Sequence, residues 1–216
     1  MKCIIYSDGS TNQKCSPVLG GWAYLIIGEK GAIAKFNSLK SWNLGEKEQY
    51  WSGEPIAIQE AANHAITIGY TDLTVITDSR NSINWIDRFK SGNTISENYR
   101  NIMQNLISKI DFKFCKVDSH KMRVLSASKT DHVLIEPNDV ISLCNNIVLD
   151  GSNVKQNVLL NSVVDSLARI AVNNDELFED FELSEDNCLS CSNKKLPILK
   201  AVNKQYAIYC LKKLLG

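Results

Sequence analysis

The sequence lacks an excess of charge of either sign. Its 24 lysines and arginines are matched by 24 aspartates and glutamates, which leaves a formal net charge of zero. A balanced chain has no global field that would draw it to nucleic acid. The composition therefore argues against a tight nonspecific nucleic-acid binder, and any contact with a polyanion must come from local patches.

Long apolar runs are also absent. No run reaches the roughly 18 residues that a membrane-spanning helix needs, and the opening MKCIIYSDGS is too short and too soon polar for a signal peptide. We therefore expect a soluble, cytoplasmic protein. The seven cysteines are an odd number, scattered apart from one CxxC at Cys188 and Cys191. In a reducing compartment they are predicted to be free thiols.

The chain is long enough to bury a core, with 216 residues of which 44% are hydrophobic. Strand-like alternation and helical periodicity, punctuated by Gly28, Gly31 and Gly69, predict an α/β fold (α+β mixed sheet) of five strands flanked by helices. The expected strands cover residues 2–7, two segments of 20–42, 73–78 and 111–117. The expected helices cover residues 52–68, 80–90, 96–110 and 158–173.

Acidic residues stand at the ends of apolar strands and within helices. They are Asp8 in IIYSDGS, Glu54 in SGEPIAIQEAA, Asp78 in LTVITDS and Asp165 in NSVVDSLARIA. Taken alone, Asp8 could be a turn residue, Glu54 a helix-dipole partner and Asp78 a cap. Asp165 lies in mid-helix, where aspartate has poor propensity, so something should compensate for it. Together they indicate more, because magnesium prefers carboxylate oxygens shared with substrate phosphates. Converging carboxylates are expected to hold a pair of such ions for phosphodiester hydrolysis.

Helical geometry distinguishes Glu54 from Glu60. At about 100° per residue, Glu60 falls on the polar side of the helix with His64. The residues that share a face with Glu54 are Ala57, Ile58, Ala61, Ala65 and Ile68. A carboxylate on such an apolar face needs a partner, which a metal would supply. Ser52 is the expected N-cap of this helix, with Pro55 in its first turn.

In this order the motifs resemble type 1 ribonuclease H, within the ribonuclease H-like superfamily. The matching segments, over roughly residues 1–172, are YSDGS with GGWAYLI, then EPIAIQEAANHAITIGYTDLTVITDS, FKFCKVDSH and NSVVDSLARIA. Each motif alone is weak, whereas the ordered set with family-like spacing from Glu54 to Asp78 is a fairly specific signal. The resemblance lapses between His120 and Asn161 and ends beyond about residue 175.

The resemblance implies a ribonuclease H-like fold and a metal-dependent endonuclease that hydrolyses the RNA strand of RNA–DNA hybrids. It implies that Asp8, Glu54, Asp78 and Asp165 hold two Mg²⁺ ions, with Mn²⁺ as the alternative, and that Asp8 touches both. In a two-metal mechanism one ion activates a water and the other stabilises the leaving 3′-oxygen. The products would carry a 5′-phosphate and a 3′-hydroxyl.

The family also has a catalytic histidine after the fifth strand, which assists proton transfer and product release. His120 in VDSH resembles it, but about 40 residues separate His120 from Asn161, where the family has a short loop. His132 is therefore the alternative candidate, and the sequence leaves the choice open.

Substrate contacts are likewise implied by the resemblance. Selectivity for RNA would use 2′-hydroxyl contacts in a shallow minor groove, with backbone amides of residues 9–11 taking part. A phosphate pocket for the DNA strand would be built from hydroxyls and amides. The candidates for these contacts are Gly9, Ser10, Thr11, Ser79, Arg80, Asn81 and Asn161, the last placed by the family's N-x-x-x-D pattern before Asp165.

The chain departs from the family before the helix glutamate. Where the family has an asparagine-rich stretch, this chain has YWSG, so that Tyr50 or Trp51 either stacks on a sugar or belongs to the core. A basic protrusion found in some members is not evident, since residues 84–100 contain only Arg88, Lys90 and Arg100. Substrate binding is therefore expected to involve the insertion or the basic tail.

Composition divides the chain into a catalytic domain over residues 1–174, an acidic linker over 175–186 and a basic extension over 187–216. An insertion over about 121–157 is expected to form short strands or a hairpin. The extension ends in an amphipathic basic helix, which is either a packing helix or a nucleic-acid clamp. Its CxxC supplies half of a zinc site, with Cys210 as one candidate third ligand, so structural zinc at Cys188 and Cys191 stays open as the minor alternative.

Two other functions remain as alternatives. In the first alternative, the fold serves as a binding or assembly module of a larger complex, and the insertion and the basic tail are docking surfaces for a protein partner. The complete set of four acids argues against such an inactive module. In the second alternative, the protein is a related nuclease that acts on DNA or structured RNA, because the same metal pair recurs across the superfamily.

Overall fold

The computed structural model describes residues 1–14, 18–42, 44–87, 94–118, 122–123, 133–173 and 177–216. Its strands are β1 (Lys2–Asn12), β2 (Leu19–Gly28), β3 (Gly31–Ser38), β4 (Asp72–Thr77), β5 (Asp111–Lys116), β6 (Met122–Arg123), β7 (Val133–Leu134), β8 (Phe181–Leu183) and β9 (Cys188–Cys191). Its helices are η1 (Leu39–Trp42), α1 (Glu46–Thr67), α2 (Arg80–Asp87), α3 (Thr94–Ile107), α4 (Pro137–Asn145), α5 (Val154–Asn173) and α6 (Asn203–Leu215).

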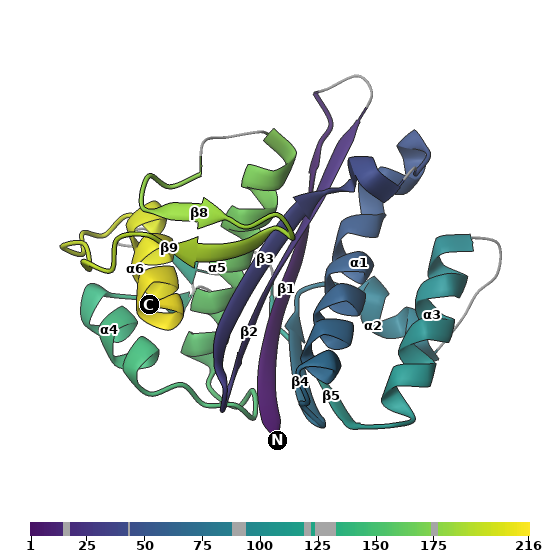
Figure 1. Ribbon diagram of the computed structural model, residues 1–216, viewed down its shortest axis with the longest axis horizontal. Coiled ribbons are helices and arrows are strands. Elements are labelled where there is room, and N and C mark those ends of the chain that lie inside the picture. The colour runs from purple at the N-terminus through teal and green to yellow at the C-terminus, as the bar shows by residue number, and fades with distance from the viewer. Residues whose placement is uncertain (15–17, 43, 88–93, 119–121, 124–132, 174–176) are drawn as a thin grey trace.

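The main sheet is mixed and has helices on both faces, which confirms the predicted fold class. Its strand order is β5-β4-β1-β2-β3-β9-β8. β4 runs parallel to both β1 and β5, whereas the pairings from β1 through β2 to β3 are antiparallel. Helices α1, α2 and α3 lie on one side of the sheet and α4, α5 and α6 on the other (Figure 1).

Two cores result from strands that are buried on both faces. Ile4 and Tyr6 of β1 point into a first core with α5, while Cys3 and Ile5 point into a second core with α1. The central strands are therefore apolar on both sides, as expected for a sheet covered by helices on each face. This packing fixes β1 and β4 between helices on both faces of the sheet.

The predicted count of five strands was too low, because β8 and β9 extend the sheet to seven strands. β9 pairs with the outer edge of β3 through Ala34 with Leu189 and Lys35 with Cys188. These strands are three and four residues long, too short for an alternation that the sequence would reveal. As a result, the segment expected to be an acidic linker contains β8 and contributes to the sheet.

The first helix begins earlier than expected. α1 starts at Glu46, where the Gly45 amide donates to Glu48 Oε2 at 2.9 Å, so Ser52 is not an N-cap. Pro55 lies inside the helix rather than in its first turn. The Ser52 hydroxyl instead donates to the Glu48 carbonyl one turn back. The sequence analysis missed the first two turns of α1, because a proline is normally expected close to the start of a helix.

The predicted insertion is described only in part. β6 and β7 form a short parallel pair, and α4 follows with Val140 and Cys144 buried. The expectation of short strands thus missed a helix. The Cys144 Sγ lies 3.4 Å from the Sγ of Cys210 on α6, so Cys210 is adjacent to Cys144 rather than to the CxxC pair.

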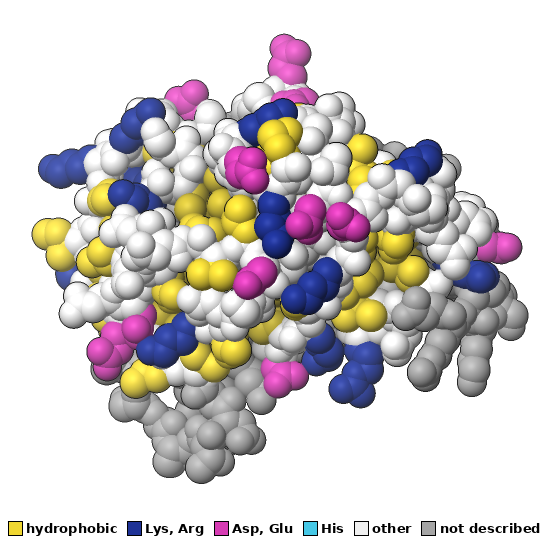
Figure 2. All heavy atoms as spheres, turned by 90° about the horizontal axis from the view of Figure 1, so that it is seen from below, with side chains coloured by type: hydrophobic (Ala, Val, Ile, Leu, Met, Phe, Trp, Pro, Cys, Tyr) yellow, Lys and Arg dark blue, Asp and Glu magenta, His cyan; other side chains and the backbone are white. Residues whose placement is uncertain are grey.

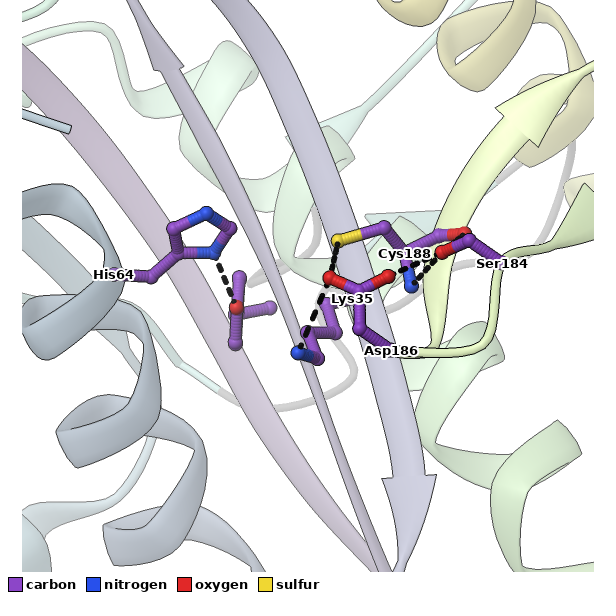
Figure 3. A network of polar contacts seen from close by, with 6 residues as sticks. Lys35, His64, Ser184, Asp186 and Cys188 are labelled. Atoms are coloured by element: carbon purple, nitrogen blue, oxygen red, sulfur yellow. Dashed lines mark hydrogen bonds and ion pairs between the residues drawn. The ribbon is translucent and has the colours of Figure 1, made fainter. Parts of the chain in front are cut away.

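The extension is attached to the sheet by polar contacts around the β8–β9 turn (Figure 3). Asp186 accepts hydrogen bonds from Ser184 and from Cys188 Sγ, the latter at 3.3 Å, and lies 3.8 Å from Lys35 Nζ on β3. Hydrogen bonds from Ser184 and Cys188 lower the pKa of Asp186 to about 2. On the other side of β2, His64 Nδ1 lies 2.7 Å from the Tyr24 hydroxyl. Among the helices of the described residues, none is long and apolar enough to cross a membrane.

Candidate active site

Two of the predicted acids meet because their strands are parallel neighbours. The register pairs Tyr6 of β1 with Ile76 of β4, so two residues further along, Asp8 and Asp78 arrive at the same level. Asp78 directly follows β4, as predicted. β1, in contrast, does not end before Asp8, although the sequence predicted a strand over residues 2–7: it continues to Asn12 through pairing with β2. Asp8 therefore lies within a strand, at the point where only its β4 neighbour has ended.

Helix α1 brings Glu54 onto this strand end through a close approach at two glycines. A Cβ at Gly9 would lie 2.4 Å from the Glu54 amide nitrogen, and one at Gly53 would lie 2.5 Å from the Gly21 carbonyl oxygen. No side chain fits at such distances, so glycine is required on both elements. The backbone of α1 therefore packs directly against the backbones of β1 and β2, and Glu54 points toward the sheet as predicted.

Hydrogen bonds hold the carboxylates in place. The Gly9 amide donates to Asp8 Oδ1 at 2.7 Å and to Glu54 Oε2 at 2.9 Å. The Thr77 hydroxyl donates to Glu54 Oε1. The Gly9 amide thus orients both acids, and its contact with a 2′-hydroxyl stays a prediction.

Asp8, Glu54 and Asp78 form a cluster in which one carboxylate oxygen from each lies within 4.8 Å of the others. Among the described residues this is the only such grouping of potential metal ligands. Asp165, from α5, lines the same cavity of about 370 Å³. Its Oδ1 accepts a hydrogen bond from Arg169 Nε at 3.0 Å. The structure thus brings all four predicted acids to one cavity, with three of them at ligating distance from a common centre.

The electrostatics of the cluster favour a bound cation. Burial raises the pKa of Asp8 well above its usual range, and the charges of Glu54, Asp78 and Asp165 raise it further. Burial and the charge of Asp78 raise the pKa of Glu54 to about 8, even though hydrogen bonds from Thr77, Asp8 and Gly9 oppose the shift. Without a cation, the cluster therefore holds its protons more tightly than ordinary carboxyl groups do. A hard divalent cation would supply the missing positive charge, and a set of carboxylate oxygens is the donor set such a cation prefers.

The other predicted site residues differ in placement. Gly9, Ser10, Thr11, Ser79 and Asn81 line the cavity. Asn161 does not line it: it is buried on α5, with no hydrogen-bond partner for its Oδ1 within the described part of the chain. Arg80 is exposed at the start of α2. His120 and His132 fall outside the described residues, so the choice between them stays a prediction.

Several residues of the cavity escaped the sequence analysis. The cavity lining also includes Gln49, Ser82, Trp85 and Arg169. Thr77 takes part through its hydrogen bond to Glu54. Arg169 carried a usable signal, since it stands four residues after Asp165 and so shares its helix face. For Thr77 the sequence offers no signal, because a threonine in a buried strand is ordinary.

Comparisons with known proteins give similarity of fold. No family model matches the chain, and no curated protein matches it in sequence. Solved structures that are similar include the N-terminal ribonuclease H domain of a Mycobacterium tuberculosis protein, at 15% identity and a TM-score of 0.45 over 55% of this chain and 83% of that one. Ribonuclease H1 of Halobacterium salinarum is similar at 16% identity and a TM-score of 0.43, over 55% and 87%. A third is LC11 ribonuclease H1, solved with an RNA/DNA hybrid, at 18% identity and a TM-score of 0.42 over 56% and 88%. Likenesses of this degree concern the fold alone.

Proposed function

We propose that this protein is a metal-dependent endoribonuclease that hydrolyses the RNA strand of RNA–DNA hybrids. The observation that carries the proposal is the cluster of the buried Asp8 with the half-buried Glu54 and Asp78 in one cavity, with Asp165 beside it. The choice of the hybrid as substrate rests on the motifs that resemble type 1 ribonuclease H. A cytoplasmic location stays a prediction from the sequence.

The four acids are proposed to hold two Mg²⁺ ions, with Mn²⁺ as an alternative. When bound, the ions would supply an activated water and stabilisation of the leaving oxygen. The remaining chemistry belongs to the chain. The Gly9 amide and the Thr77 hydroxyl orient Glu54, and Arg169 orients Asp165. Such fixed positioning matters because displacing a reacting group by about 1 Å can reduce a rate about a hundredfold.

Polar groups of the lining are proposed to bind the substrate. Ser10 and Thr11 lie on the β1 side of the cavity, and Ser79 and Asn81 on the α2 side. Hydroxyls and amides of this kind contact phosphate and sugar oxygens without reading base sequence. All four acids precede residue 175, so we propose residues 1–174 as the catalytic unit and 187–216 as an extension that covers it.

A panel of end-labelled substrates tests the proposal. The purified protein would be incubated with Mg²⁺ or with EDTA on an RNA–DNA hybrid, double-stranded RNA, double-stranded DNA and single strands. We expect cleavage of the hybrid's RNA strand alone, with Mg²⁺ alone, leaving 5′-phosphate ends. Cleavage of DNA or of double-stranded RNA instead would identify a related nuclease. The absence of any cleavage by the folded protein would favour the binding-module alternative.

A further inference from the structure

The cavity of the four acids has an aromatic wall. Trp51 and Trp85 both line it, with ring centroids 5.4 Å apart and planes at 79°. Behind Trp85, the ring of Tyr99 lies 6.5 Å away at 73°. Tyr99 is buried, whereas both tryptophans are half-buried. The wall is thus anchored on its inner side and open toward the cavity.

The wall is carried by the same elements that carry the acids. Trp51 stands three residues before Glu54 on α1, so the two side chains lie on one helix face about one turn apart. Trp85 lies on α2, which starts two residues after Asp78. A strand whose phosphate reaches the carboxylates would therefore pass alongside the indole of Trp51.

Packing separates a core role from a substrate role for Trp51. Trp85 packs against the second core, and so does Trp42 of η1. Trp51 belongs to neither core, although it is one of the largest side chains of α1. Its ring contact is with Trp85, and its remaining surface lines the cavity. For Trp51 this placement argues against the core role that the sequence left open, whereas the side chain of Tyr50 lies outside the described part of the structure.

The charge of the cavity makes such a contact valuable. Among the described lining residues the sole cation is Arg169, and its Nε is used by Asp165. Attraction between the lining and a polyanion is therefore small, and affinity has to come from other contacts. A flat aromatic face offers a large apolar contact area at low entropic cost, and its packing on a sugar ring does not depend on the base sequence.

We propose that Trp51 is a substrate-binding residue whose ring packs on the sugar next to the scissile phosphate. This inference rests on the proposed function, since it assigns to that site a nucleic-acid strand as ligand. It assigns affinity to Trp51 and leaves the chemical step to the carboxylates. Trp51 is accordingly expected to affect KM much more than kcat.

The test compares Trp51→Phe, which keeps a flat ring, with Trp51→Leu, which keeps apolar volume alone. Trp42→Phe and Trp42→Leu are matched controls, because Trp42 is half-buried in the second core and outside the cavity lining. Binding of a fluorescently labelled hybrid would be measured by anisotropy in an Asp78→Asn background, and KM and kcat in the wild-type background. Circular dichroism and thermal unfolding check the fold, and Trp51→Met replaces the leucine variant if that one fails to fold.

We expect Trp51→Leu to weaken binding about tenfold and to raise KM by a similar factor, with kcat within about twofold. Trp51→Phe should retain most of the affinity, and both Trp42 variants should bind like their parent. Unchanged binding by Trp51→Leu, or an equal loss in the phenylalanine variant, overturns the stacking role. A protein that binds the hybrid through Trp51 yet never cuts it would uphold this contact while contradicting the proposed reaction.

Discussion

At the scale of single residues, the site depends on acids that repel one another. Asp8 and Glu54 share one amide donor, and for each of them burial and the charge of neighbouring carboxylates raise the pKa. In the absence of metal this cluster destabilises the fold at neutral pH. With metal, the same arrangement becomes a binding site of high charge density. Two predictions follow at this scale, one without metal and one with it.

Replacing Glu54 by Gln should stabilise the metal-free protein in a pH-dependent way. The pKa of Glu54 is raised from 4.5 to about 8, so between these values the folded state binds more protons than the unfolded state. Wild-type stability therefore falls as pH rises through this window. The gain of Glu54→Gln over wild type should grow from pH 4.5 to pH 8 by about 1–3 kcal/mol. Urea unfolding in EDTA at several pH values measures it, with the exposed Glu97→Gln as control. A gain independent of pH would contradict the shift.

Magnesium should raise the thermal stability of the wild-type protein and release a proton. A ligand that binds only the folded state stabilises it by about 2.7 kcal/mol at a hundred times its Kd. Asp8→Asn should lose most of this stabilisation, because Asp8 lies at the centre of the cluster. Thermal unfolding with increasing Mg²⁺ measures the effect, and the exposed carboxylate variant Asp111→Asn serves as control. Equal shifts in Asp8→Asn and wild type would place the ion elsewhere.

At the scale of elements, the contact between α1 and β1 positions Glu54. Gly53 lies inside a helix, where glycine normally costs about 1 kcal/mol relative to alanine. Here the order should reverse, since a Cβ at Gly53 would lie 2.5 Å from the Gly21 carbonyl oxygen and 3.0 Å from Gly9 Cα. The helix would have to move away from the strand, and Glu54 would move with it.

We therefore expect Gly53→Ala to destabilise the protein by about 1–3 kcal/mol and to reduce cleavage at least about tenfold. Chemical denaturation and the hybrid cleavage assay measure the two effects. Gly45→Ala is the control, because a Cβ there would approach only the end of the flexible Glu48 side chain, at 3.3 Å. An active and more stable Gly53→Ala protein would show that the close approach is not needed.

The sequence predicted those elements whose signal is local. Strand ends at Asp78 and the apolar face of Glu54 were visible because alternation and helical period appear within a few residues. The start of α1 was not visible, since Pro55 resembles a first-turn proline. β8 and β9 form by pairing with β3, a contact between distant segments that leaves no local pattern. The role of Trp51 required knowing which side chains the cores exclude.

At the scale of the whole molecule, the C-terminal extension completes the first core. Tyr206, Cys210 and Leu211 of α6 are fully buried against it. The Lys212 ammonium is buried as well, where it pairs with Asp180 and donates to the Lys195 carbonyl. Lysine and arginine side chains are interspersed with aspartate and glutamate side chains on the face drawn in Figure 2, in keeping with the zero net charge. The extension is thus expected to unfold together with the sheet.

Leu211→Ala should destabilise the entire protein by about 2–5 kcal/mol, because it leaves a cavity in the first core. Unfolding should remain a single transition, followed identically by circular dichroism and by tryptophan fluorescence. Leu196→Ala is the matched control, since Leu196 is 38% exposed. Two separate transitions would instead indicate an extension that folds independently of the catalytic unit.

The central claim is that the buried carboxylates form a catalytic metal site. The most direct measurement is cleavage of an end-labelled RNA–DNA hybrid in Mg²⁺ by the wild-type protein and by Asp78→Asn, both verified as folded by circular dichroism. We predict that the wild type cuts the RNA strand and that the variant is slower by at least about a thousandfold, which corresponds to about 4 kcal/mol. Equal cleavage by the two proteins would contradict the account.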